Sequence, residues 1–252
     1  MTSLEVWKYL HILMFVFWVG TDMGVMLGAR KSTDSRLPLD ARMLMVKLAL
    51  LIELLPRTMW AMALPFGVTL SRATGLLDIS DAGLAAVWVF SLVWVTISLG
   101  GAHWAEKPIG QKLARLNRWI IGVLGVVLIG IGAASYLGMG PFETGWLAAK
   151  VALYGAINLT VLGIEASFVP VGPAFGRLFT EGSTPDVEAA ISRGMDRTMF
   201  WVYFSYILIL IVGSIGIARP EAINLQFAAY FAFIAVAASA AFTGMGRLLR
   251  AA

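Results

Sequence analysis

Apolar and polar positions alternate along this chain in long blocks rather than residue by residue. Seven apolar blocks are separated by short polar segments. A helix needs about 20 apolar residues to cross about 30 Å of hydrocarbon, so each block predicts a membrane span. The expected spans are about 5–29, 50–73, 83–104, 117–138, 145–168, 197–218 and 222–246. The pattern therefore predicts an all-α, polytopic bundle of seven spans, with residues 1–252 forming a single transmembrane domain.

The composition agrees with a protein whose main partner is the lipid bilayer. Of the 252 residues, 59% are hydrophobic and 13% are charged, whereas soluble domains are nearer half apolar and a quarter charged. These values exclude a disordered chain and a nucleic-acid-binding arm. The absence of cysteine excludes disulfides, iron–sulfur clusters and covalently attached c-type haem.

Basic residues gather in alternate loops and predict an orientation. Fourteen Lys and Arg residues follow or flank spans one, three, five and seven, whereas Lys8, Arg72 and Arg219 lie on the other side. The positive-inside rule then places the N-terminus outside and the C-terminus in the cytoplasm. We expect a multi-pass protein of a bacterial inner membrane.

The longest polar segment is 169–196. It is interrupted by Pro170, Gly172, Pro173, Gly182 and Pro185. Because these residues break helices, we expect a loop here, with a short surface helix over 186–195.

Two parts of the chain resemble each other. Residues 57–60 read Arg-Thr-Met-Trp, and residues 197–200 read Arg-Thr-Met-Phe. We therefore expect two parallel two-helix repeats, repeat A over about 5–75 and repeat B over about 145–218. A hairpin over about 83–138 would be inserted between them, and an extra helix over about 222–248 would follow. Chance identity is the alternative, because the shared motifs are short.

Ionisable side chains at membrane depth are costly, so each one predicts a function or a partner. They are His11, Asp22, Glu53, Arg57, Lys150 and Glu165, with His103 at the end of a span. If the repeats face each other, His11 and Lys150 converge about 9 Å below the outer surface. A neutral imidazole there can ligate haem iron or copper. The structural alternatives are a hydrogen bond from the histidine to a backbone carbonyl and a lysine that extends to the headgroups.

Trp7, His11, Trp18 and Asp22 share one helical stripe by their spacing of four and seven residues. This polar and aromatic stripe is expected to face the interior of the bundle. His103 lies near the opposite membrane face, so the two histidines cannot hold one haem between them.

Glu53 and Arg57 are four residues apart, which predicts an intrahelical ion pair. Arg57 can instead reach a haem propionate or an anionic lipid. Asp22 and Glu165 lie toward the inner ends of their spans, where each would serve as a proton relay or reach the interface.

Residues 7–12 read Trp-Lys-Tyr-Leu-His-Ile, and residues 18–20 read Trp-Val-Gly. This start resembles the first helix of the HemJ-like membrane protoporphyrinogen oxidases and, more loosely, the copper-resistance D-type membrane proteins. The HemJ-like family pairs its first-helix histidine with a lysine in a later helix that begins Trp-x-x-x-Lys. Trp146 and Lys150 fit that pattern. The family has about four helices in a shorter chain, so spans three, four and seven are departures from it.

The resemblance implies a haem b pocket in which His11 is the axial metal ligand and Lys150 is a second ligand or charge partner. Arg57 would contact a propionate, and Trp7 and Trp18 would flank the ring. The implied activity is oxidoreduction similar to protoporphyrinogen oxidation, with electrons passing to a quinone or another respiratory-chain partner.

Two other functions remain open at this point. The 12 methionines suit Cu(I), and Asp22, Asn158 and Glu165 provide part of a polar path, so a copper or small-solute transporter is one alternative. A non-catalytic membrane subunit of a larger complex, or of a homo-oligomer, is the other.

Overall fold

The computed structural model describes residues 2–221 and 229–241, and over these ranges all regular structure is helical, as predicted. The helices are α1 (Ser3–Ser32), α2 (Leu39–Ala73), α3 (Asp81–His103), α4 (Pro108–Tyr136), α5 (Gly145–Phe168), α6 (Val171–Glu181) and α7 (Pro185–Ala218). A shorter apolar helix covers Ala229–Ala241.

Five helical segments of the described chain are long and apolar enough to cross a membrane. They are α1, α3, α4, the segment Gly145–Glu181 and α7. The fold is therefore that of a multi-pass membrane protein in contact with a lipid bilayer. The span expected over 222–246 lies partly outside the described residues. The number of seven spans and their orientation stay predictions.

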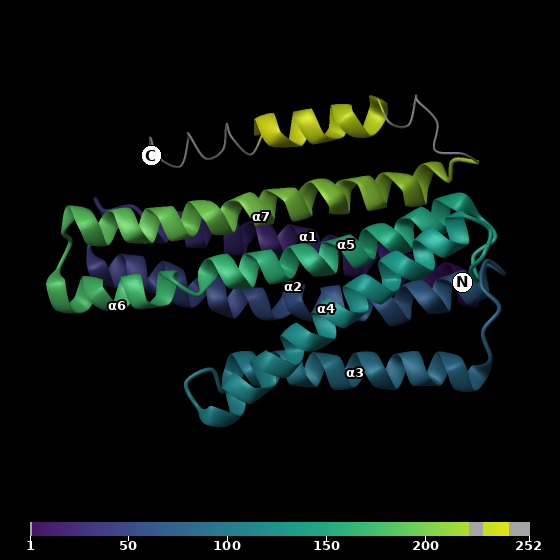
Figure 1. The fold of residues 1–252 in the computed structure, drawn as a ribbon, viewed down its shortest axis with the longest axis horizontal. Helices are drawn as coiled ribbons and strands as arrows, with labels where there is room; N and C mark the ends of the chain where they lie inside the picture. Colours follow the sequence, from purple (N-terminus) through teal and green to yellow (C-terminus); the bar gives the residue numbers. More distant parts are fainter. Residues whose placement is uncertain (1, 222–228, 242–252) are drawn as a thin grey trace.

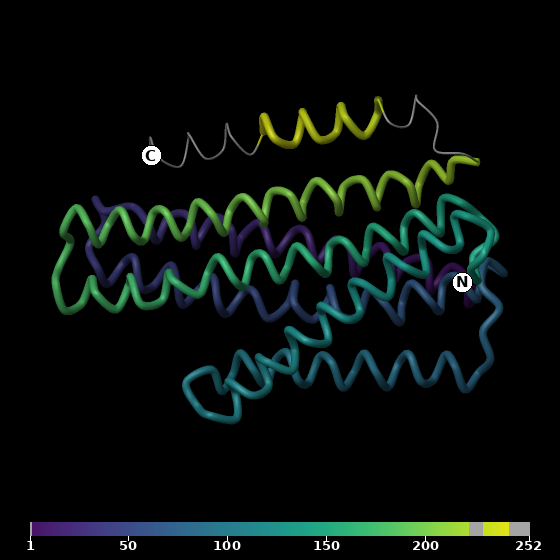
Figure 2. The backbone as a smooth tube through the Cα atoms, in the orientation of Figure 1, coloured from purple at the N-terminus to yellow at the C-terminus, as the bar shows by residue number. Residues whose placement is uncertain are grey.

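Successive long helices run antiparallel along the long axis of the molecule (Figures 1 and 2). The start of α1 and the 74–80 and 137–144 loops lie at one end. The 33–38 and 104–107 segments lie at the other end with α6 (Figure 1). This arrangement confirms that alternate loops share an end of the bundle.

The helices form two closely packed groups. α1 packs along α2, while α5 packs along both α4 and α7, and α3 contacts α2 and α4. In contrast, no Cα atom of α1 lies within 8 Å of a Cα atom of α5. Closely packed helices have axes 8–10 Å apart, with Cα atoms that approach more closely than that. Only side chains therefore meet across the space between α1 and α5.

Glycines explain the close approach of α4 and α5. A Cβ atom added at Gly132 would lie 2.6 Å from the backbone oxygen of Ala148. One added at Gly155 would lie 2.6 Å from the backbone oxygen of Gly125. Any larger side chain at either position would separate the two helices.

Within the loop expected over 169–196, the helix expected over 186–195 is present, but as the beginning of α7 and not as a separate surface helix. The rest of the loop is a wrong prediction, because α6 occupies most of it. Pro170 is the N-cap of α6, and Pro173 lies in its first turn. Pro185 is the first residue of α7. A proline is tolerated at these positions because the N–H that it lacks has no partner within the helix. Gly182, at φ 76°, adopts the left-handed conformation that ends α6.

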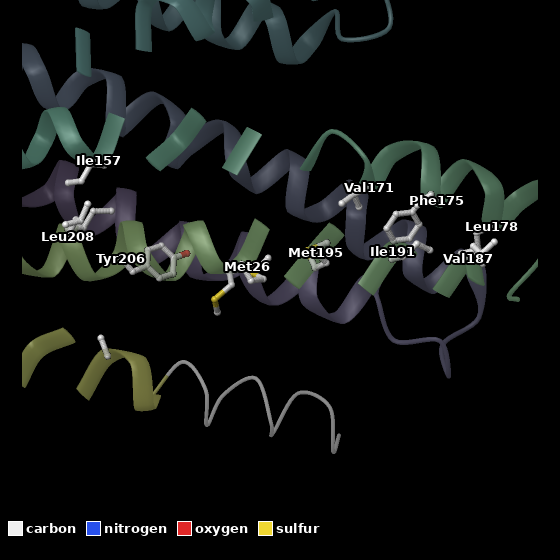
Figure 3. Close-up of a cluster of buried hydrophobic side chains, with 14 residues drawn as sticks. Met26, Ile157, Val171, Phe175, Leu178, Val187, Ile191, Met195, Tyr206 and Leu208 are labelled. Atoms are coloured by element: carbon white, nitrogen blue, oxygen red, sulfur yellow. The ribbon is translucent and has the colours of Figure 1, made fainter. Parts of the chain in front are cut away.

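The apolar face of α6 packs on the first turns of α7. Val171, Phe175 and Leu178 of α6 are buried in the same cluster as Val187, Ile191 and Met195 of α7 (Figure 3). A second cluster, at the middle of the bundle, contains the buried rings of Trp60 and Trp94, whose centroids are 4.9 Å apart.

Arg42 of α2 connects α1, α2, α6 and α7 at the end of the bundle where α6 lies. Its guanidinium donates to both carboxylate oxygens of Glu188, at 2.7 and 3.0 Å, and its Nε donates to the backbone oxygen of Ser32 at 2.8 Å. It also lies 5.5 Å from the centre of the Phe175 ring. Partial burial alone would raise the pKa of Glu188, but the hydrogen bonds from Arg42 and Ser183 outweigh it and hold that pKa below its usual value.

Candidate functional site

His11 on α1 and Lys150 on α5 lie close enough to interact electrostatically. The imidazole Nδ1 of His11 is buried and has no hydrogen-bond partner. No described residue forms a hydrogen bond or an ion pair with Lys150. Within the described residues, Lys150 thus lies within electrostatic range of His11, and neither the Nδ1 of His11 nor Lys150 has a hydrogen-bond partner.

Glycines border this pair on the neighbouring helices. A Cβ atom added at Gly67 of α2 would lie 3.8 Å from the His11 Cε1 atom, and one at Gly216 of α7 would lie 2.5 Å from the Lys150 Nζ atom. A Cβ atom at Gly213 would lie 3.2 Å from the ring of Phe15. The side chains of Lys150 and Phe15 therefore pack directly on the α7 backbone at Gly216 and Gly213, whereas a Cβ atom at Gly67 would make an ordinary contact with His11.

The site is electrically positive. Arg219 interacts electrostatically with Lys150 and lies 5.5 Å from the centre of the Trp146 ring. It ends α7 in a left-handed conformation, at φ 44°. No sequence motif identified Arg219 or Gly216 as part of the site. The only available signal was the position of both residues at the C-terminal end of an expected span.

The two predicted flanking tryptophans lie on either side of His11 along α1. Trp7 is one turn before it and contacts Phe66 and Trp88, each at a centroid distance of 6.1 Å. Trp18 is two turns after it and packs against both buried clusters. Trp7 thus forms an aromatic wall with α2 and α3, while Trp18 belongs to the packed interior.

Arg57 lies in a separate ionic cluster. It forms the expected ion pair with Glu53, and its Nη1 donates to the hydroxyl of Ser98 at 3.5 Å. It also interacts electrostatically with Asp22 and Glu165. Glu165 in turn lies 3.9 Å from Arg118 of α4.

This ionic cluster is well removed from the histidine. Asp22 follows His11 by eleven residues on the same helix, which corresponds to about 16 Å. Because Arg57 accompanies Asp22, the structure does not bring Arg57 to the pair of His11 and Lys150. The sequence predicted the pair of Glu53 and Arg57, but it did not predict that this pair lies with Asp22 and Glu165.

A polar stripe on α5 connects the two sites. Tyr154 follows Lys150 by one turn and donates to the backbone oxygen of Trp60 at 2.8 Å. Asn158, one turn further, donates to the backbone oxygen of Tyr154 at 2.8 Å, and its buried Oδ1 atom has no partner. Glu165 ends the stripe, so polar groups recur along α5 from the first site to the second.

His103 takes no part in either site. It ends α3 at the opposite end of the bundle from the start of α1, and its ring lies 5.4 Å from that of Trp104 (Figure 1). The interpretation that one haem cannot join the two histidines agrees with this placement.

The residues around His11 fit a haem b better than a bare metal ion. No group of three or more His, Asp or Glu side chains that could hold a metal ion occurs in the described chain. A haem brings its own macrocyclic ligands and needs one or two axial donors, which His11 and Lys150 can supply. Lys150 and Arg219 provide positive charge for two propionates. The Cα atoms of α1 and α5 stay more than 8 Å apart, so only side chains can lie between these two helices here.

Comparison with known proteins assigns no family. The chain matches no family model, and no curated protein and no solved structure shows significant similarity to it. The likeness to HemJ-like oxidases therefore rests on residues 7–20 and on the Trp146–Lys150 motif.

Proposed function

We propose that this chain is a membrane-embedded haem b protein that acts in oxidoreduction or electron transfer. One observation carries the proposal, namely that the buried Nδ1 of His11 has no hydrogen-bond partner. Buried polar atoms in folded proteins nearly always have a partner. The unpartnered imidazole nitrogen, with Lys150 within electrostatic range, supports a ligand at His11.

The chain's own residues have distinct roles in this proposal. His11 would ligate the haem iron, and Lys150 would be either a second ligand or a charge partner of a propionate. Arg219 would contact a propionate, while the wall of Trp7, Phe66 and Trp88 would keep water away from the ring. The bound haem would supply a one-electron redox centre.

The proposed reaction is of the HemJ-like type, an oxidation of protoporphyrinogen with electrons passed to a quinone or another respiratory-chain partner. We propose that the protein lies in a bacterial inner membrane, with seven spans and its N-terminus outside. The packing of α1 along α2 and of α5 along α7 is compatible with the two parallel repeats.

The absorbance spectrum of the detergent-purified protein tests the haem proposal. Protein from haem-replete cells is expected to show a Soret band, with sharp α and β bands after dithionite reduction. His11→Ala should remove these bands, and Lys150→Ala should shift them. His103→Ala is the matched control, because it removes the other histidine of the chain, and it should leave the spectrum unchanged. A colourless wild-type protein, or a coloured His11→Ala variant with the same spectrum, contradicts the proposal.

A small-solute or copper transporter is the second candidate, and the polar stripe on α5 favours it. Lys150, Tyr154, Asn158 and Glu165 provide polar groups across most of the helix, and the Oδ1 atom of Asn158 is buried without a partner. Proteoliposomes made with the purified protein test this function. A colourless protein that carries copper, or whose proton-coupled uptake is lost in Asn158→Leu, would favour transport over haem chemistry.

A further inference from the structure

Two clefts meet at the exposed ring of Trp119 on α4. The first, of about 520 Å³, lies between α4 and α5. Arg115, Arg118 and Trp119 line it from α4, and Leu162, Glu165 and Ala166 line it from α5. The second, of about 430 Å³, lies between α3 and α4. Neither cleft includes His11 or Lys150, so this surface is distinct from the proposed haem site.

The two clefts differ sharply in polarity. Two guanidinium groups line the first. The second is lined only by apolar side chains, which come from Phe90, Trp119, Ile120, Val123, Leu124 and Val127. A molecule that occupies both must therefore be charged at one end and apolar along the rest.

The charged end lies where a membrane interface is expected. Arg115 and Arg118 lie about two and three turns after Pro108, where α4 begins. Residues 120–134 of the helix are all apolar or glycine. Tryptophan is enriched at the boundary between headgroups and hydrocarbon, and Trp119 is 69% exposed. The first cleft therefore faces headgroups and the second faces acyl chains.

The charge of the first cleft selects an anion. Arg118 lies 3.9 Å from Glu165, so these two charges largely offset each other. Arg115 is exposed, and no described residue forms an ion pair with it. One positive charge is left uncompensated above an apolar groove.

We infer that this surface is a specific binding site for an anionic glycerophospholipid. Arg115 and Arg118 bind its phosphate-bearing headgroup, as basic pockets between membrane helices do. The indole of Trp119 contacts the glycerol region, and one acyl chain lies against Val123 and Val127. A free phosphate would satisfy the arginines but would leave the apolar groove unfilled.

Quenching of tryptophan fluorescence by brominated lipids tests the inference. The full chain is reconstituted in phosphatidylcholine that contains increasing amounts of acyl-brominated phosphatidylglycerol or acyl-brominated phosphatidylcholine. The difference between wild type and Trp119→Phe isolates the signal of Trp119. The wild type is expected to bind phosphatidylglycerol in preference to phosphatidylcholine by about fivefold, the ratio for one uncompensated basic residue near the membrane surface.

Variants that remove one arginine distinguish a specific lipid site from general attraction between anionic lipids and a basic protein. Arg115→Gln should lower the preference to near one, and this residue has no ion pair whose loss would disturb the fold. Arg193→Gln is the matched control, because Arg193 is an equally exposed arginine on α7, and it should retain the preference. A Trp119 signal quenched equally by both lipids in the wild type overturns the inference, as does equal loss in the two variants.

Mass photometry of the same protein, reconstituted in nanodiscs of these lipids, shows whether the chain is a monomer or a dimer. If the chain is a dimer in which Trp119 is shielded from both brominated lipids, a second copy occupies the clefts and the inference is wrong. Accessible Trp119 in a monomer, with the expected lipid preference, supports it.

Discussion

The guanidinium of Arg42 and the carboxylate of Glu188 form a two-point ion pair, at 2.7 and 3.0 Å, between residues 146 positions apart in the sequence. The pair joins the first turn of α2 to the first turn of α7, and the Arg42 side chain is only 2% exposed. Since a buried guanidinium without a counter-charge is strongly unfavourable, this contact fixes how the α1–α2 hairpin meets the rest of the bundle.

Glu188→Gln is expected to lower the free energy of unfolding by about 3 kcal/mol, because it leaves Arg42 buried without its counter-charge. Thermal unfolding in detergent, followed by circular dichroism, measures the change. The control is Glu181→Gln, which removes the partner of Arg177 in an exposed ion pair and should change the stability far less, because solvent screens exposed charges. Equal effects of the two substitutions would contradict the structural role of Arg42.

Stability should decrease in acid because of carboxylates outside the membrane. The hydrogen bonds from Arg42 and Ser183 depress the pKa of Glu188, and hydrogen bonds from Arg36 and Lys31 depress that of Asp34. A carboxylate whose pKa is lower in the folded than in the unfolded protein stabilises the fold when the pH is above its pKa in the unfolded protein, which is 4.5 for a glutamate. This stabilisation is lost as the pH falls through the pKa of the folded protein. The unfolding temperature should therefore be steady from about pH 7 to about pH 5 and fall below that range. Glu188→Gln should show a weaker dependence in the same interval, and an identical pH profile would argue against this assignment.

The contact between α4 and α5 should not tolerate a methyl group at its glycines. Gly132→Ala places a Cβ atom 2.6 Å from backbone atoms of α5, so we expect a loss of about 1–3 kcal/mol in detergent. Gly130→Ala is the matched control, since nothing lies within 4 Å of a Cβ atom at that position of the same helix. Unchanged stability of Gly132→Ala would show that α4 and α5 pack differently from the structure.

Gly216→Ala should alter the proposed haem site without unfolding the chain. The added Cβ atom would lie 2.5 Å from the Lys150 Nζ atom, which sits at the end of a flexible side chain and can move away. If Lys150 is an axial donor, the Soret band of the purified protein should shift, while the melting temperature should change little. Gly20→Ala, on α1, is the control, because its Cβ atom meets nothing within 4 Å. A wild-type spectrum in Gly216→Ala would exclude Lys150 as a ligand but would leave His11 as one.

The block pattern predicted the helical fold well because burial in hydrocarbon imposes a fixed length on each helix. The ends of the helices were harder to predict. Pro170 and Pro173 suggested a loop, yet they occupy the cap and first turn of α6, where a missing N–H costs nothing. Only the packing of Phe175 and Leu178 against α7 makes that short helix stable.

The residues of the candidate site were also predicted only in part. The spacing of Trp7 and Trp146 predicted that His11 and Lys150 converge; in the structure the two residues lie within electrostatic range of each other, and their role in one site stays a prediction. Arg57 was assigned to the same site because its charge suits a propionate. Its position further along the bundle could not be read from the sequence, because helical spacing fixes a residue's face but not its neighbours on other helices.

The sequence by itself determined that this protein is a bundle of apolar helices with a few ionisable side chains among them, since hydrophobic length and charge cost are local properties of the chain. Only the tertiary structure decided which of those side chains are partnered. Arg57 joins Glu53, Asp22 and Glu165 in one ionic cluster, and His11 and Lys150 are left unpaired beside Gly67 and Gly216. The physical reason is that the cost of burying a polar group depends on what other helices place beside it, and that is set by packing rather than by position in the sequence.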